Sequence, residues 1–349
     1  MFFASDNGGP AAPEVIAAIT RANEGVAMPY GNDPIMDSVR AKIRDIFEAP
    51  DAAVYLVATG TAANSLALAS LVQPWETIYC HRIAHIEEDE CGAPEFFTGG
   101  SKLTLLEGES GKIDPESLRA AIGYTARAGV HNVQKGALSI TNATEAGAVY
   151  SVEEVTALCD IAKENEIPCH MDGARFANAL VRLGCTPAEL SWKAGIDVLS
   201  FGGTKNGLLG VEAVIMFDPK LAWEFELRRK RGGHLFSKHR FLSAQMDAYL
   251  TDDLWRDLAK KANRAADRLA AGILAVPGAS LMHPMQANAI FASWPRKGHI
   301  KAQEAGAKYY HWPFDQSLDG PLDETISARL VCNWATTDTE IDVFLALIS

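Results

Sequence analysis

A single lysine, Lys205, lies in a turn of small residues between two apolar segments. The turn spans residues 202–207 (GGTKNG), and the flanking segments 197–201 and 211–217 are short and rich in β-branched residues. Short apolar runs bounded by glycine predict buried strands. A lysine amine at the end of a buried strand is poorly hydrated, which lowers its pKa and makes it a nucleophile that can form a Schiff base. The alternative is a surface turn whose lysine is solvated.

Asp172 ends a second predicted strand, residues 167–172, and glycine follows it. Ligands of open parallel sheets bind beyond the carboxyl ends of the strands, so we expect Asp172 to face the same ligand as the lysine. A carboxylate there can keep a pyridinium nitrogen protonated, which makes the ring an electron sink. Arg175 can clamp a carboxylate or a phosphate nearby. The alternative is a turn aspartate paired with this arginine.

A third strand, predicted at residues 53–58, ends in Thr59-Gly60-Thr61, and an alanine- and leucine-rich helix begins at about residue 62. A strand, a turn of small residues and a helix together point free backbone N–H groups at an anion. The sequence has neither a P-loop nor a G-x-G-x-x-G pattern, so it predicts a site for one phosphate rather than a nucleotide. An ordinary N-capped helix is the alternative.

Other polar clusters have simpler interpretations. His81 and His85 are four residues apart, which on one helix could hold a metal ion, but no third ligand is specified and we predict no metal site. The acidic run 87–90 is expected to be a solvated face. The basic run 228–231 is expected to be solvated too, or to reach an anion across a subunit interface.

Composition narrows the class of protein. The chain has 349 residues, of which 48% are hydrophobic and 22% are charged, as in an ordinary globular enzyme. A net charge of -12 argues against nucleic acid and anionic membranes as partners. The six cysteines form no C-x-x-C pair, and the sequence contains no leader and no apolar run that approaches a membrane span. We therefore expect a cytoplasmic protein.

Strands and helices alternate up to about residue 250, which predicts an α/β fold with a mostly parallel sheet covered by helices on both faces. A long helix over residues 255–275 follows, and then short strands and a terminal helix from about residue 338. We expect a large domain at 1–250, which includes the N-terminal segment, and a smaller α+β domain at 251–349.

The order of phosphate turn, strand-end aspartate and lysine resembles that of pyridoxal-phosphate enzymes of fold type I, which have a seven-stranded, mostly parallel sheet. Residues 170–175 (HMDGAR) and the lysine turn are similar to threonine aldolases of the β-eliminating lyase family. Residues 5–7, 30–31, 60–61 and 329–331 fit the same pattern. The resemblance is strongest to low-specificity L-threonine aldolases, including those that act on phenylserine.

The resemblance implies cofactor-binding roles. Lys205 would form the Schiff base with pyridoxal 5'-phosphate, and Asp172 would pair with the ring nitrogen. Gly60 and Thr61 would bind the phosphate, and His85 would stack on the ring.

It also implies roles toward a small amino-acid substrate. Ser5, Arg175 and Arg329 would hold the substrate carboxylate, with Arg175 also near the cofactor. His131 would lie near the substrate hydroxyl, and Tyr30 would come from a loop at a subunit boundary. The implied assembly is a homotetramer whose active sites are shared between paired subunits.

The implied reaction is retro-aldol cleavage of L-threonine, L-allo-threonine or a related L-β-hydroxy-α-amino acid to glycine and an aldehyde. His131, His85 or a bound water would take the hydroxyl proton. Asn7, where many relatives carry threonine, and the acidic run, where relatives are often glycine-rich, depart from the family pattern and bear on substrate range. An aminotransferase, a lyase that eliminates at Cβ, and a scaffold without activity are the alternatives.

Overall fold

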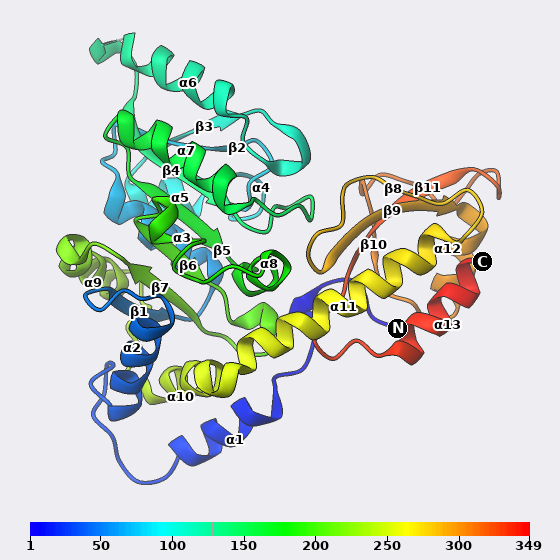
Figure 1. Ribbon diagram of the computed structural model, residues 1–349, viewed down its shortest axis with the longest axis horizontal. Helices are drawn as coiled ribbons and strands as arrows, with labels where there is room; N and C mark the ends of the chain where they lie inside the picture. The colour runs from blue at the N-terminus through cyan, green and yellow to red at the C-terminus, as the bar shows by residue number, and fades with distance from the viewer. Residues whose placement is uncertain (128) are drawn as a thin grey trace.

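The computed structural model describes residues 1–127 and 129–349 and is built on a seven-stranded sheet (Figure 1). The strand order is β1-β7-β6-β5-β4-β2-β3. Only β7 runs antiparallel to its neighbours β1 and β6; the other pairs are parallel. The predicted α/β fold is thus confirmed. The strands are β1 (Ala53–Val57), β2 (Glu76–His81), β3 (Lys102–Leu106), β4 (Gln134–Thr141), β5 (Cys169–Gly173), β6 (Val198–Phe201) and β7 (Glu212–Met216).

Helices cover both faces of this sheet because successive side chains of a strand point to opposite sides. In β7, Ala213 and Ile215 face one core, whereas Val214 and Met216 face another. The first core is closed by α2 (Pro34–Ile46), α6 (Pro115–Arg127), α7 (Val152–Glu164), α8 (Phe176–Leu183) and α10 (Arg240–Leu250). The second is closed by α3 (Gly60–Leu71) and α9 (Ala222–Arg231). Strands buried on both faces explain the continuous apolar runs of the sequence.

A second, antiparallel sheet of order β10-β11-β9-β8 follows the long helix α11 (Leu254–Leu274), which Figure 1 shows running from the large sheet towards the small one. Phe3 is buried in the core of this smaller unit, and Phe2 pairs with Lys308. The start of the chain therefore packs on the smaller unit. The remaining elements are α1 (Pro13–Ala22), α4 (His85–Glu88), α5 (Ala93–Thr98), β8 (Ser280–Leu281), β9 (Ala289–Pro295), α12 (Arg296–Glu304), β10 (Tyr310–His311), β11 (Thr325–Val331) and α13 (Asp338–Ile348).

His81 ends β2 and His85 begins α4, so the two histidines do not share a helix. Two local expectations are corrected. Glu90, expected to be solvated, is buried. Arg229 of the basic run is buried as well: its guanidinium lies over the Tyr55 ring, 5.0 Å from the ring centre, and pairs with Glu226.

Within the described residues, none of the helices combines the length and the apolar composition that crossing a membrane requires.

Candidate active site

A cavity of about 450 Å³ lies beyond the carboxyl ends of β4 and β5 and is lined by residues of both units. This is the edge of the sheet where open parallel sheets bind ligands. The cavity brings together most of the residues predicted from the sequence: Ser5, Gly60, His85, Asp172, Arg175, Lys205 and Arg329.

Lys205 is held in a short 3-10 helix, Thr204–Asn206, directly after β6. The backbone N–H of Gly203 donates a 2.6 Å hydrogen bond to the buried carboxylate of Glu212, which fixes the start of this turn. Burial, followed by the positive charge of Arg175, lowers the pKa of the Lys205 amine. Within the described residues the amine has no hydrogen bond or ion pair, so it is free to act as a nucleophile.

Asp172 is 3% exposed and accepts two hydrogen bonds. Its Oδ1 accepts from the Ala174 N–H at 2.9 Å, and its Oδ2 accepts from the Asn64 side chain at 2.8 Å. Burial alone would raise the pKa of Asp172, but the charges of His85 and Lys205 and the backbone hydrogen bond outweigh it and hold the pKa below its ordinary value. The side chain therefore stays ionised and can stabilise a cationic nitrogen in the cavity.

The His85 ring is oriented by Glu90. Its Nδ1 lies 2.9 Å from Glu90 Oε1, and the same oxygen accepts a 2.9 Å hydrogen bond from Asn64. The hydrogen bond to Glu90 raises the pKa of His85 although burial opposes it. One nitrogen or oxygen atom from each of His85, Glu90 and Asp172 lies within 4.8 Å of the other two. The ring is thus fixed beside the carboxylate at the end of β5.

The two arginines of the cavity differ in their partners. Arg175 forms a bidentate ion pair with Asp6, with its Nε 2.7 Å from Oδ2 and an Nη 3.0 Å from Oδ1. Asn288 donates a third hydrogen bond to this buried carboxylate. In the described part of the chain, the Arg329 guanidinium makes no hydrogen bond or ion pair. Arg329 is therefore the guanidinium that is available to a ligand carboxylate.

The N-terminus of α3 opens into the cavity at Gly60. Thr59 caps this helix, since its hydroxyl accepts from the Ala62 N–H at 3.1 Å and its carbonyl accepts from the Ala63 N–H at 3.0 Å. Among the described residues, nothing accepts a hydrogen bond from the N–H of Gly60 or Thr61. A Cβ placed on Gly60 would meet no atom within 4 Å. Two free N–H groups and open space at a helix N-terminus suit a phosphate.

Residues 3–294 match the β-eliminating lyase family, and this match covers more than half of the chain. The chain belongs to the β-eliminating lyase family. Two proteins similar to this chain are low-specificity L-threonine aldolases from Pseudomonas. The one from Pseudomonas aeruginosa is 43% identical over 97% of this chain and 94% of its own length, and the one from Pseudomonas sp. (strain NCIMB 10558) is 42% identical with the same coverage.

The fold comparison agrees with the sequence comparison. The solved structure of threonine aldolase from Leishmania major matches with a TM-score of 0.90 and 26% sequence identity, over 99% of this chain and 98% of that one. The fold and the family expected from the sequence are confirmed.

Three residues predicted for the site lie outside the lining of the cavity in this family member. His131 is exposed and ends a short helix that precedes β4, whereas the cavity lies at Thr141, where that strand ends. An eight-residue strand is about 26 Å long, so His131 does not reach the cavity of its own chain, and its role near the substrate hydroxyl stays a prediction. Thr61 offers only its backbone N–H. Tyr30 is 42% exposed and accepts a hydrogen bond from Ser237 on the surface.

Sequence reasoning missed four polar residues that build the site. Asp6 adjoins the predicted Ser5, and only the fold brings it to Arg175. Asn64 lies among the small and apolar residues of α3, which was a usable signal, because a buried helix position carries an amide only when it has partners. Glu90 belongs to an acidic run and Glu145 to the loop after β4, and neither position stands out from its neighbours in the sequence.

Proposed function

We propose that this chain catalyses pyridoxal-phosphate-dependent retro-aldol cleavage of L-threonine, L-allo-threonine and related L-β-hydroxy-α-amino acids, phenylserine among them, to glycine and an aldehyde. The observation that carries this proposal is the presence of Lys205 and Asp172 in one cavity with a helix N-terminus and with Arg329, whose guanidinium has no partner among residues 1–127 and 129–349. The near-complete coverage of the Pseudomonas L-threonine aldolases supports the choice of substrate.

The residues present fit pyridoxal phosphate. The free N–H groups of Gly60 and Thr61 would hold the phosphate, ionised Asp172 would hold the ring nitrogen, and His85 would contact the ring. Lys205 provides the amine that links to the cofactor. When bound, the cofactor supplies an aldehyde that joins covalently to amines and a ring that accepts the electron pair of a breaking bond.

The protein's own contribution is to bind and orient the amino acid. The Arg329 guanidinium, with Ser5, would hold the substrate carboxylate, and this fixes which bond at Cα is presented for cleavage. Positioning of this kind can contribute about 7 to 11 kcal/mol when the geometry is ideal. Arg175 keeps its pair with Asp6 and so positions the N-terminal segment that carries Ser5.

The assembly and location belong to the same proposal. We propose a homotetramer in the cytoplasm, with each active site completed by Tyr30 of a paired subunit. Exposed apolar side chains on α5 and α9, namely Phe96, Trp223 and Leu227, support self-association. The cysteines at positions 80, 91, 159, 169, 185 and 332 are all free thiols, which is the usual state in a reducing compartment.

Product analysis tests the reaction. The full chain loaded with pyridoxal phosphate should release glycine together with acetaldehyde from L-threonine or L-allo-threonine, and with benzaldehyde from phenylserine. Ammonia and a keto acid in place of glycine would instead indicate elimination at Cβ. Transfer of the amino group to an added keto acid would indicate an aminotransferase.

Lys205→Ala should abolish covalent attachment of the cofactor. The measurement is borohydride reduction followed by peptide mass spectrometry, which should find the reduced adduct on Lys205 in the wild-type chain and none in the variant. Lys220→Ala, which changes an 86%-exposed lysine, is the matched control. An adduct that persists on another lysine would reject the assignment.

A further inference from the structure

Glu145 lines the cavity together with Asp172 and Lys205. It follows the end of β4, at the same edge of the sheet as Asp172. Its Oε1 accepts a 2.8 Å hydrogen bond from the backbone N–H of His85. Its Oε2 is inaccessible to solvent and has no hydrogen-bond partner among the described residues. One oxygen is therefore anchored, and the other is buried without a partner in the described part of the chain.

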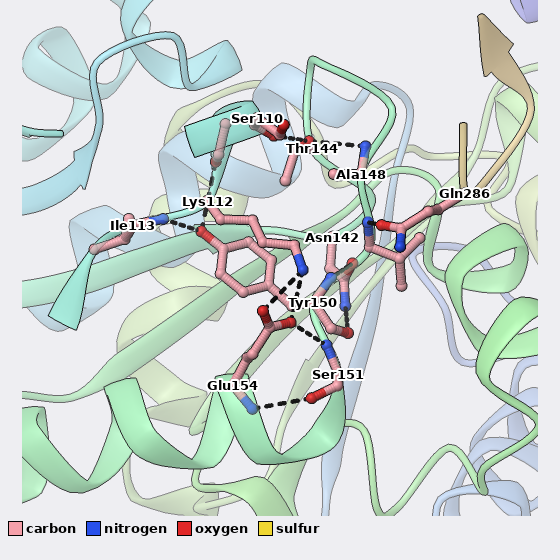
Figure 2. A network of polar contacts seen from close by, with 12 residues as sticks. Ser110, Lys112, Ile113, Asn142, Thr144, Ala148, Tyr150, Ser151, Glu154 and Gln286 are labelled. Atoms are coloured by element: carbon pink, nitrogen blue, oxygen red, sulfur yellow. Dashed lines mark hydrogen bonds and ion pairs between the residues drawn. The ribbon is translucent and has the colours of Figure 1, made fainter. Parts of the chain in front are cut away.

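The turn that carries this carboxylate is held rigidly (Figure 2). Thr144 and Ala148 close it, because the Thr144 N–H donates to the Ala148 carbonyl at 2.8 Å and the Ala148 N–H donates to the Thr144 hydroxyl at 3.1 Å. The same hydroxyl donates to the Ser110 carbonyl at 2.8 Å. Asn142 and Tyr150 pair across the base of the turn in two further hydrogen bonds. The carboxylate thus projects from a fixed support.

Other groups that could take the hydroxyl proton are less suitable. His131 lies before β4, at the opposite edge of the sheet, and does not line the cavity of its own chain. The Nδ1 of His85 is engaged by Glu90, and the resemblance gives its ring to the face of the cofactor. Asp172 already accepts two hydrogen bonds and faces the predicted ring nitrogen.

We propose that Glu145 accepts the proton of the substrate β-hydroxyl during cleavage and returns it when the aldehyde is added back. This inference rests on the proposed function. As the O–H proton moves to the carboxylate, the hydroxyl carbon becomes the aldehyde carbon and the Cα–Cβ bond breaks. The electron pair of that bond stays with the Cα fragment, which leaves as glycine after Cα is protonated. No oxidant or reductant is required.

The acidity of the group suits this task. Burial, and then the negative charge of Asp172, raise the pKa of Glu145 to about 7, although hydrogen bonds from its own and the His85 backbone and the His85 charge act in the opposite direction. A base that titrates near neutral pH is effective in both directions of proton transfer. The other charged groups that line the cavity are Glu88, Asp89, Glu90, Arg175, Lys205 and Arg329.

The pH dependence of turnover should follow the ionisation of the Glu145 carboxylate. Below about pH 7 Glu145 is protonated and cannot accept a proton, so turnover of cleavage should rise with pH through that value and then level off. Addition of an aldehyde to glycine needs the protonated form and should fall over the same interval.

The test compares Glu145→Gln, Glu145→Asp and the control Glu116→Gln, which changes an 84%-exposed residue, as cofactor-loaded full chains. In Glu145→Gln, turnover on phenylserine should fall about 100- to 10,000-fold and lose its rise near pH 7. Cofactor affinity and exchange of the glycine Cα proton with deuterated water, followed by NMR, should be retained. Glu145→Asp should recover part of the turnover, and Glu116→Gln should behave as wild type.

A second readout does not depend on activity. Infrared difference spectra of the wild-type chain across pH 6 to 8 should contain a protonated-carboxyl band that is absent from Glu145→Gln. Loss of glycine exchange in step with turnover would show that Glu145 is structural, and unchanged turnover would place the base elsewhere. If the wild-type chain exchanged glycine but cleaved none of the hydroxy amino acids, the proposed function would fail, and the glutamate titration would still be measurable.

Discussion

Arg175 and Arg329 line the same cavity, yet their surroundings give them different tasks. Arg175 has both arms of its guanidinium on Asp6, which is itself buried and held by Asn288. Arg329 is partly buried with no protein partner among the described residues, and burial together with the charge of Arg175 lowers its pKa. A poorly hydrated cation without a counter-ion favours an incoming carboxylate.

Arg329→Ala should weaken the use of substrate. Because a hydrogen bond to a charged group contributes roughly 1.5–3 kcal/mol, kcat/KM should fall about 10- to 150-fold, mainly through KM. Arg329→Lys keeps the positive charge but should still show part of this loss in kcat/KM, since an ammonium cannot bind a carboxylate with two parallel hydrogen bonds. Steady-state kinetics with threonine measure kcat and KM of each variant. The control is Arg264→Ala, which changes an 82%-exposed residue. An unchanged KM would remove Arg329 from carboxylate binding.

Helix α3 connects two ends of the cofactor site. The N–H groups of its first residues, Gly60 and Thr61, have no partner in the part of the chain that the structure describes, and Gly60 lines the cavity. One turn further on, Asn64 donates to both Asp172 and Glu90. A single rigid helix therefore sets the spacing between the predicted phosphate position and the predicted ring-nitrogen position, and its cap becomes part of the site.

Thr59→Ala should lower the free energy of unfolding by about 1 kcal/mol, the usual effect of losing an N-cap side chain. Because this cap lies beside the proposed phosphate site, cofactor affinity should fall as well. Thr337→Ala removes the equivalent cap of α13, whose residues do not line the cavity, and should lower stability without changing cofactor affinity. Urea unfolding and cofactor titration measure the two quantities. Equal cofactor affinities in both variants would contradict the assignment of α3.

At the scale of the whole molecule, the cavity depends on two packed units. The large sheet supplies Asp172 and the lysine turn, and the smaller unit supplies Arg329 on β11. Tyr30, by contrast, lies on the surface of its own chain, with its backbone N–H bonded to the Ser237 carbonyl. Its predicted role near a substrate requires a second copy of the chain.

Mixed assemblies test this shared site. Lys205→Ala and Tyr30→Ala should each be impaired alone, and co-expression with different tags should yield mixed oligomers that regain part of the activity. Recovery is expected because one cavity of a mixed pair then carries both substitutions and the other carries neither. Activity that stays at the level of the separate variants would show that Tyr30 does not act in the cavity of a neighbouring subunit.

Stability should depend on pH through three buried histidines. Burial lowers the pKa of His170 to about 4, of His239 to about 4 and of His299 to about 3. Because these folded-state pKa values lie below the ordinary 6.5, the neutral histidines contribute fully to the free energy of unfolding above pH 6.5. This contribution is lost as the pH falls towards 4. Each histidine should add a slope of up to about 1.4 kcal/mol per pH unit.

Urea unfolding at several pH values measures this slope, and His299→Gln should reduce it. The same slope in the variant and the wild type would exclude the contribution of His299. The raised pKa of Glu145 has the opposite sign, since its contribution is present below about pH 4.5 and is lost as the pH rises to about 7. Glu145→Gln should therefore steepen the loss of stability on acidification.

The local sequence pattern determined the secondary structure and the positions of two key site residues. The strands, the capped helices and the strand-end positions of Asp172 and Lys205 follow from apolar periodicity and turn residues, because such signals act within a few residues along the chain. The order of these motifs was enough to indicate the family and the fold.

Tertiary packing decided which polar side chains meet. Asp6 reaches Arg175, 169 positions further along the chain, and Glu90 and Glu145 acquire their roles only where α4, β4 and β5 converge. The position of His131 outside the cavity of its own chain has the same cause. A residue before a parallel strand lies at the opposite edge from one after it, and only the assembled sheet places the ligand at the carboxyl ends of its strands.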